Sequence, residues 1–210
     1  MSNSIIIKSI LTPDNLYWHE GDIDIIDSID NSYSEHFRYY HNFDHILDCL
    51  DEFKEVEDQF NHPNLAKFAI LYHDIVCIPG YGGNEEASIV RACYDASILG
   101  ISKEDQNLIV SCIRVTNHKF IPTTKGCILV KDIDLSILGQ DKDKFMRYED
   151  SIREEYNNYD TLTYSSCRLS FLNKLLNEPR IYLSDYFYEK YEKKARDNIK
   201  HSIEILNSTR

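Results

Sequence analysis

Apolar residues recur at intervals of three and four positions along most of the chain, a spacing typical of helices with one buried face. Between residues 43 and 56, Ile46, Leu50 and Phe53 share such a face. The same spacing predicts further helices over about 64–74, 85–99, 103–116, 128–138, 145–156, 169–176 and 184–206. Residues 5–11 fit either a strand or a helix. Because no alternation of strands and helices and no repeat period appears, we predict an all-α protein.

Local signals at the ends of these segments support their boundaries. Asn42 and Asn84 stand where an N-cap is expected, and Ser102 with Asp105 resembles a capping box. Gly100 follows a helical segment at the position where glycine commonly ends a helix. Residues 79–83 contain one proline and three glycines, which predicts a loop between two helices.

Length and composition place the chain among ordinary globular proteins. With 210 residues it is predicted to form one domain, residues 1–210, and its 42% apolar and 28% charged residues are typical of that class. Seven glycines and five prolines are too few for a β-sandwich or barrel with a turn every ten residues. The aromatic-rich last helix could be buried in the core or against a partner, so a homodimer stays open.

Charge, cysteines and hydropathy narrow the function classes. The balance of 23 basic and 35 acidic residues gives a net charge of −12, which argues against binding duplex nucleic acid. None of the six cysteines forms a CxxC pair, so we expect free, buried thiols in a reducing compartment. No window of about 18 apolar residues and no signal-peptide pattern appears, so we expect a soluble, cytoplasmic protein without membrane contact.

Candidate chemistry lies where histidines and aspartates meet the predicted helices. His41 and His45 are four positions apart and share a helix face, and His73-Asp74 comes directly before the glycine-rich loop. Asp132 and Asp134 interrupt an otherwise apolar helix, where an unpaired carboxylate would be costly. Two imidazoles and two carboxylates suit a first-row divalent metal. On spacing alone, hydrogen-bonded core residues explain the same pattern.

The order of these residues resembles the H…HD…D signature of the HD superfamily of metal-dependent phosphohydrolases. It is similar to one branch in particular, the predicted metal-dependent HD superfamily phosphohydrolases, whose substrates are largely undefined. The resemblance covers roughly residues 33–206, with core motifs over about 33–160 and C-terminal helices over 161–206 packing on them. The segments that carry it are 38–46, 72–75, 84–88, 132–139 and 152–156.

The resemblance implies that His45, His73, Asp74 and Asp134 ligate a divalent metal such as Mn, Fe, Zn or Ni, with Mg also compatible. Asp134 is preferred as the last ligand because it precedes a leucine, as the superfamily's last aspartate commonly does. Asp132 would then orient a ligand histidine, or would be an acid on the helix surface.

Three residues receive catalytic roles from the resemblance. Asp74 would bind the metal and also accept a proton from the attacking water. Glu85 would position that water, although Glu86 is a near-equal choice and both also suit the first turn of a helix. His118 would contact substrate or a second metal, and its alternative role is to end its helix as a favourable cation.

Arg38, His41 and Arg153 are the candidate phosphate-binding residues, since arginine neutralises phosphate oxygens in bidentate fashion. Surface charges or structural ion pairs are the alternative for each. The resemblance therefore predicts an enzyme that hydrolyses a phosphoester or phosphoanhydride of a small phosphorylated molecule, a nucleotide foremost. Three alternatives stay open: a non-catalytic sensor that binds metal and nucleotide, a di-iron oxygenase of HD type, and a purely structural helical adaptor that binds no metal.

Overall fold

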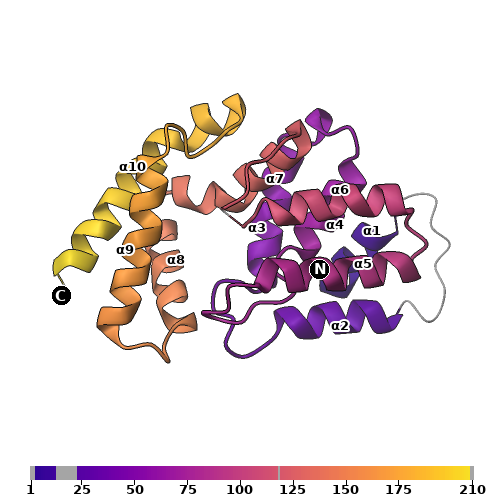
Figure 1. The fold of residues 1–210 in the computed structure, drawn as a ribbon, viewed down its shortest axis with the longest axis horizontal. Helices are drawn as coiled ribbons and strands as arrows, with labels where there is room; N and C mark the ends of the chain where they lie inside the picture. The colour runs from indigo at the N-terminus through magenta and orange to yellow at the C-terminus, as the bar shows by residue number, and fades with distance from the viewer. Residues whose placement is uncertain (1–2, 13–22, 118, 209–210) are drawn as a thin grey trace. The chain divides into compact units, whose positions relative to one another are not determined.

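The computed structural model describes residues 3–12, 23–117 and 119–208. Within these ranges the chain is helical and has no strand, which confirms the all-α prediction (Figure 1). No helix there is both long and apolar enough to cross a membrane. The helices are α1 (Asn3–Leu11), α2 (Ile23–Tyr33), α3 (Phe43–Lys54), η2 (Glu57–Gln59), α4 (Pro63–Tyr72), α5 (Asn84–Ile98), α6 (Lys103–Arg114), α7 (Lys125–Asp134), η3 (Leu135–Gly139), α8 (Lys142–Glu155), α9 (Thr161–Asn177) and α10 (Asp185–Ser208).

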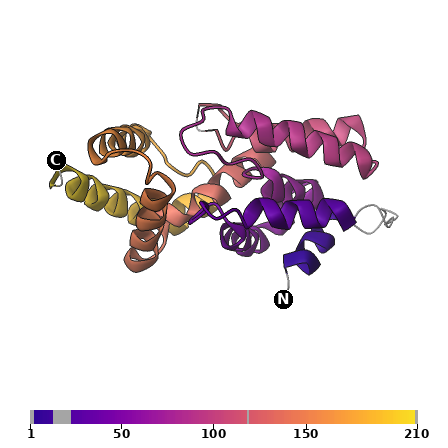
Figure 2. The ribbon, with the colours of Figure 1, turned by 90° about the horizontal axis from the view of Figure 1, so that it is seen from below.

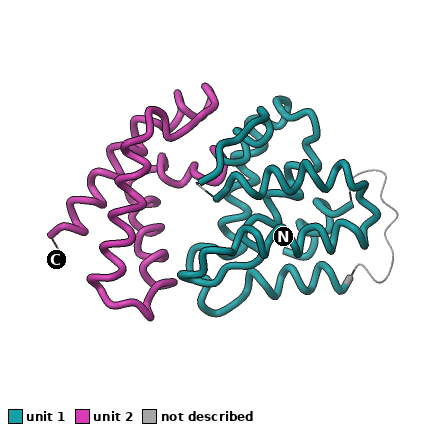
Figure 3. The backbone as a smooth tube through the Cα atoms, viewed as in Figure 1, with its two compact units in different colours: residues 1–131 teal, residues 132–210 magenta. Residues whose placement is uncertain are grey.

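The chain divides into two compact units, Met1–Lys131 and Asp132–Arg210 (Figure 3). The boundary falls inside α7, whereas the sequence indicated a single domain with its core motifs over about 33–160. Residues 132–160 group with the C-terminal helices because η3 and α8 both pack against α10. The two units are therefore described one at a time.

The first unit buries a core drawn from six helices. In this unit α5 lies beside α6, and α1 beside α2 (Figure 2). Three signals that the sequence suggested at helix ends are present. Asn42 caps α3 by accepting the N–H of Asp44 at 2.9 Å, and Ser102 caps α6 by accepting the N–H of Asp105 at 3.1 Å. Gly100 follows α5 with a φ of 71°, a left-handed conformation that glycine adopts without strain. The core contains Ile7, Leu11, Ile29, Ile46, Leu71, Ala92 and Ile113.

Three local expectations need correction or completion. Residues 5–11, ambiguous in the sequence, belong to the helix α1, and α2 was not anticipated. Asn84 is the first residue of α5 and does not cap it. Its side-chain amide instead bonds both the N–H and the C=O of Ile78, at 3.0 Å each. Asn84 therefore closes the glycine-rich loop back on itself.

Buried polar contacts and a close approach of η3 to α10 join the helices of the second unit. Arg168 of α9 forms an ion pair of 2.5 Å with Glu149 of α8, and Ser202 of α10 donates to the same carboxylate at 2.9 Å. A Cβ placed on Gly139 would lie only 2.7 Å from Cγ of Tyr191, so η3 and α10 touch where no larger residue fits. These contacts join the helices of the unit.

The six cysteines are all free thiols, as the sequence suggested. Their burial was predicted too broadly, because only Cys49 and Cys127 are buried and Cys167 is exposed. Cys167 lies on the solvent face of α9, between Ser166 and Arg168 in the sequence.

Candidate metal centre

His73 and Asp74 follow α4, the most completely buried helix of the first unit. Tyr72, the last residue of α4, donates a hydrogen bond of 2.9 Å to Asp95 of α5. Arg91 donates to the same carboxylate at 2.6 Å, so the buried Asp95 is paired. This network fixes the end of α4, and with it the direction in which His73 and Asp74 leave the helix.

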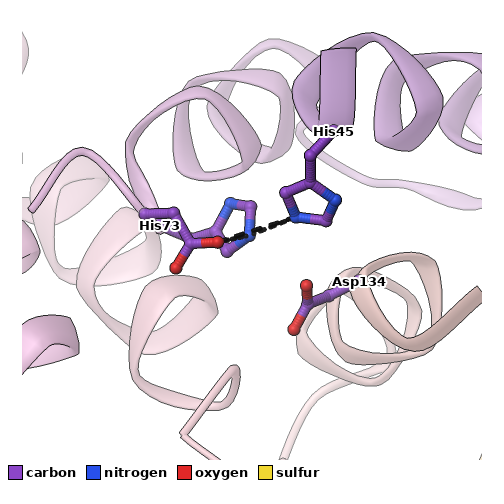
Figure 4. A group of neighbouring side chains, drawn as sticks. His45, His73 and Asp134 are labelled. Carbon is purple, nitrogen blue, oxygen red and sulfur yellow. Dashed lines mark hydrogen bonds and ion pairs between the residues drawn. The ribbon is translucent and has the colours of Figure 1, made fainter. Parts of the chain in front are cut away.

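His45 reaches the same place from the first turn of α3, which packs against α4. Figure 4 shows the imidazole rings of His45 and His73 pointing toward each other. Their Nε2 atoms are 3.1 Å apart. Oδ2 of Asp74 lies 3.6 Å from Nε2 of His45 and 3.0 Å from Nε2 of His73. Three atoms that can bind a metal thus meet at one point.

These separations fit a divalent ion. For a ligand–metal distance of about 2.1 Å, neighbouring ligand atoms lie about 3.0 Å apart around an octahedral ion and about 3.4 Å apart around a tetrahedral one. The three distances of 3.0, 3.1 and 3.6 Å are close to these values. His45, His73 and Asp74 therefore form a largely buried His/Asp group that could hold a metal ion.

The second nitrogen of His73 supports the same conclusion. Its Nδ1 lies 2.8 Å from the backbone carbonyl oxygen of Ile70, which can only accept a hydrogen bond. The proton of the neutral ring is therefore on Nδ1, and the lone pair of Nε2 faces His45 and Asp74. Metal-binding histidines in proteins are commonly oriented in this way.

The electrostatics favour an ionised Asp74. Burial would raise the pKa of Asp74, but the imidazoles of His73 and His41, in their protonated form, outweigh burial and hold that pKa well below its ordinary value. The carboxylate is therefore in the charged form that binds cations. The ring of His41 also lies 6.0 Å from that of His45, so His41 stands beside the group without being part of it.

Asp132 and Asp134, in the second unit, have different surroundings. Asp132 is fully buried, and its two carboxylate oxygens accept the N–H groups of Leu183 at 2.9 Å and Ser184 at 2.7 Å. It is therefore not an acid on the helix surface, and its oxygens hold the segment that leads into α10. Asp134 is the last residue of α7 and is half-buried.

Arg38 is tied into the backbone around the His/Asp group. It is only 6% exposed, and Nη1 donates to the carbonyl oxygens of His41 at 2.9 Å and Asp74 at 2.6 Å. Nη2 donates to the carbonyl oxygen of Ile75 at 3.0 Å, and Nε binds Glu35 at 2.9 Å. These contacts position the two segments that carry the group, while phosphate binding by Arg38 stays a prediction.

Arg153 also makes internal contacts, in the second unit. Nη1 donates to the carbonyl oxygen of Tyr156 at 2.7 Å and Nη2 to that of Tyr159 at 3.2 Å. The guanidinium lies 4.7 Å from the centre of the Tyr164 ring. Arg153 thus satisfies carbonyls at the end of α8. Its role as a phosphate ligand is likewise still a prediction.

The remaining catalytic candidates differ in their surroundings. Glu86 is exposed and forms an ion pair of 3.0 Å with Arg114 of α6, whose hydrogen bonds lower the pKa of Glu86. Glu85, its neighbour in the first turn of α5, is half-buried. The ion pair gives Glu86 a structural partner, which favours Glu85 as the candidate for positioning the attacking water. His118 lies outside the described residues.

Two features of this region were not found from the sequence. Arg91 and Asp95 are four positions apart, a spacing that permits an ion pair on a helix, but nothing in the sequence links them to Tyr72 of another helix. Cys77 follows His73 and Asp74 in the sequence, and its sulfur lies within 4.8 Å of a ring nitrogen of His41. No pattern in the sequence distinguishes this cysteine from the other five.

Comparison of the chain with family models, with curated proteins and with solved structures finds no match.

Proposed function

We propose that this chain is a metal-dependent phosphohydrolase of the HD type that acts on a small phosphorylated molecule. The observation that supports this most is the convergence of Nε2 of His45, Nε2 of His73 and Oδ2 of Asp74 within 3.0 to 3.6 Å. An adjacent His-Asp pair that meets a histidine from a preceding helix is the arrangement that the sequence motif implies.

The donor set indicates which ions to expect. Two imidazole nitrogens and a carboxylate suit first-row transition metals such as Mn, Fe, Ni or Zn better than Mg. When bound, such an ion supplies a water of lowered pKa and polarises a phosphoryl oxygen. His73 presents its Nε2 lone pair because Ile70 holds the proton on Nδ1. Asp74 keeps a carboxylate that can also take the proton of the attacking water.

Asp134 is proposed as the fourth ligand. It is the last residue of α7 and precedes Leu135, as the last aspartate of the superfamily's motif commonly precedes a leucine. Asp132 is the weaker choice because Leu183 and Ser184 already occupy its two oxygens. The sequence favoured Asp134 and kept Asp132 as the alternative, and the hydrogen bonds of Asp132 support the same preference.

The proposed substrate is a phosphate ester or anhydride, with nucleotides as the first class to test. A protein with a net charge of −12 needs a local cation to attract such an anion, and a metal at the His/Asp group would supply it. His41 lies beside that group and can contribute a further positive charge when protonated.

The test combines metal content and turnover in the same samples. Protein purified without chelator is analysed for bound metal, then assayed for phosphate release from a panel of nucleotides with added Mn²⁺. We expect about one metal per chain or more, and loss of both metal and phosphate release in Asp74→Ala. The control is Asp44→Ala, which removes an exposed carboxylate next to His45 and should change neither.

Three outcomes would contradict the proposal. Metal without phosphate release from any nucleotide would favour the sensor, and iron with oxygen-dependent turnover would favour the oxygenase. If the protein is folded, contains no metal and behaves the same after Asp74→Ala, the metal site does not exist.

A further inference from the structure

A pair of cysteines in the first unit lies apart from the His/Asp group. Cys112 belongs to the last turns of α6 and Cys127 to the first turn of α7, and their Sγ atoms are 3.6 Å apart. Fourteen residues separate them in the sequence. A sulfur–sulfur bond of about 2.0 Å needs only a small further approach. The other four cysteines are free as well.

The position of Cys127 activates its sulfur. Cys127 is the third residue of α7, and its N–H is bonded to Oγ1 of Thr124 at 3.3 Å. The N-terminal end of a helix stabilises a thiolate. The hydrogen bond from Cys112 contributes most, and together with Thr124 it lowers the pKa of Cys127 to about 6, although burial opposes this. The hydrogen bond with Cys127 and burial raise the pKa of Cys112, so Cys112 keeps its proton.

We propose that Cys112 and Cys127 form a redox-active dithiol that a low-molecular-mass disulfide, such as oxidised glutathione, converts into an intramolecular disulfide. Cys127 is the attacking residue, since it holds the thiolate, and Cys112 is the resolving residue. Because Cys127 is only 3% exposed, the exchange requires a local opening of the first turn of α7. The proposal does not depend on the phosphohydrolase activity or on a bound metal.

The exchange takes place in two balanced steps. The Cys127 thiolate attacks one sulfur of the oxidised glutathione, forms a mixed disulfide and expels one glutathione thiolate. That thiolate takes the proton of Cys112, and the Cys112 sulfur then attacks the sulfur of Cys127 and expels the second glutathione. Two thiols of the protein are oxidised to one disulfide, and one glutathione disulfide is reduced to two thiols. The new bond would join α6 to the beginning of α7.

The experiment uses the full chain, folded, in a buffer with chelator and oxidised glutathione. Remaining thiols are alkylated, the protein is digested without reductant, and the peptides are identified by mass spectrometry. We expect one linked pair, Cys112 with Cys127, with a mass loss of two hydrogen atoms that reductant reverses. In Cys112→Ser the resolving thiol is absent, so Cys127 should accumulate the glutathione mixed disulfide. Cys167→Ser, which removes an exposed cysteine outside the pair, should behave as the wild type.

Circular dichroism shows whether each variant has folded. If the Cys112→Ser variant does not fold, Cys112→Ala takes its place. Glutathione adducts without a Cys112–Cys127 link in the folded wild type would overturn the proposal. So would a link that forms only after unfolding in urea, or the same adduct yield on Cys127 in wild type and Cys112→Ser.

Discussion

Nη1 of Arg38 donates a hydrogen bond of 2.6 Å to the backbone carbonyl oxygen of Asp74. The same nitrogen bonds the carbonyl oxygen of His41, which precedes α3, at 2.9 Å. One buried guanidinium therefore connects the segment that leads to His45 with the segment that contains Asp74. The distance between the two halves of the candidate metal site depends on this residue, although Arg38 contributes no ligand atom.

Replacing Arg38 should therefore weaken metal binding. In Arg38→Met we expect the affinity for Mn²⁺ to fall by roughly ten- to a hundredfold, since residues that orient ligands have effects of this size. The free energy of unfolding should fall by about 2 kcal/mol or more, because buried carbonyl groups lose their donor. Calorimetric titration and urea unfolding in chelator measure the two effects.

Arg114→Met is the matched control, because Arg114 forms an exposed ion pair with Glu86 on the surface of the same unit. It should leave metal affinity unchanged. If Arg38→Met keeps its metal affinity and raises only the KM for a phosphorylated substrate, Arg38 is the phosphate ligand that the sequence suggested.

The two aspartates of α7 should separate stability from metal binding. Asp132→Ala leaves the N–H groups of Leu183 and Ser184 without their acceptor, so we expect a loss of about 2 to 4 kcal/mol in the free energy of unfolding. Asp134→Asn should reduce metal affinity with a smaller effect on stability. Urea unfolding and metal titration of both variants test this, and the reverse pattern would make Asp132 the ligand.

The helices were largely predictable from hydrophobic spacing, and local signals mark several of their ends. The cap of α3 by Asn42, the cap of α6 by Ser102 and the left-handed Gly100 all follow from side-chain chemistry within a few residues. Asn84 was misjudged because its amide bonds Ile78, six residues away, in preference to the end of its own helix. The division inside α7 depends on contacts between distant helices, which hydrophobic spacing does not specify.

The candidate site was predictable only as a motif. His45, His73 and Asp74 stand out by type and order, and the structure brings their ligand atoms together. The internal contacts of Arg38 were not predictable, because they depend on backbone carbonyls brought together by folding. From the sequence alone, an arginine beside a site motif fits phosphate binding as well as it fits a structural role.

Glu85 and Glu86 should differ in their effect on catalysis, if the chain is the phosphohydrolase proposed above. Glu86 already binds Arg114, so Glu86→Gln should change kcat less than twofold and stability by less than about 0.5 kcal/mol. Glu85→Gln should lower kcat by roughly a hundredfold if this residue positions the attacking water. Steady-state phosphate release by both variants, at equal metal occupancy, measures the difference. Equal loss in the two would contradict the assignment.

The reactivity of Cys127 should follow an unusually low pKa. The hydrogen bond from Cys112 and the bond with Thr124 lower it to about 6, against 9.0 for an ordinary thiol. We therefore expect the alkylation rate of Cys127 by iodoacetamide to rise with a midpoint near pH 6. In Cys112→Ala the midpoint should move up toward the ordinary value. Peptide-resolved alkylation between pH 5 and 9 is the measurement, and a midpoint that Cys112→Ala leaves unchanged would contradict this cause.

The same shift has a consequence for stability. Because the folded state loses the Cys127 proton at a lower pH than the unfolded state, the unfolded chain binds more protons between about pH 6 and pH 9. The free energy of unfolding should rise with pH over that window, and the stabilisation is lost as pH falls through 6. The rise should be smaller in Cys112→Ala, which urea unfolding at several pH values would show.

Gly139 should tolerate no side chain. An added Cβ would lie 2.7 Å from Cγ and 2.8 Å from Cδ1 of Tyr191, closer than such atoms approach in proteins. The conflict begins at the base of the tyrosine, so a rotation of its ring cannot relieve it and α10 must move away from η3. We expect Gly139→Ala to lower the free energy of unfolding by about 1 to 3 kcal/mol. Gly82→Ala is the control, because a Cβ there meets nothing within 4 Å. Urea unfolding of the two variants makes the comparison, and equal stability would mean that η3 and α10 are packed more loosely than described.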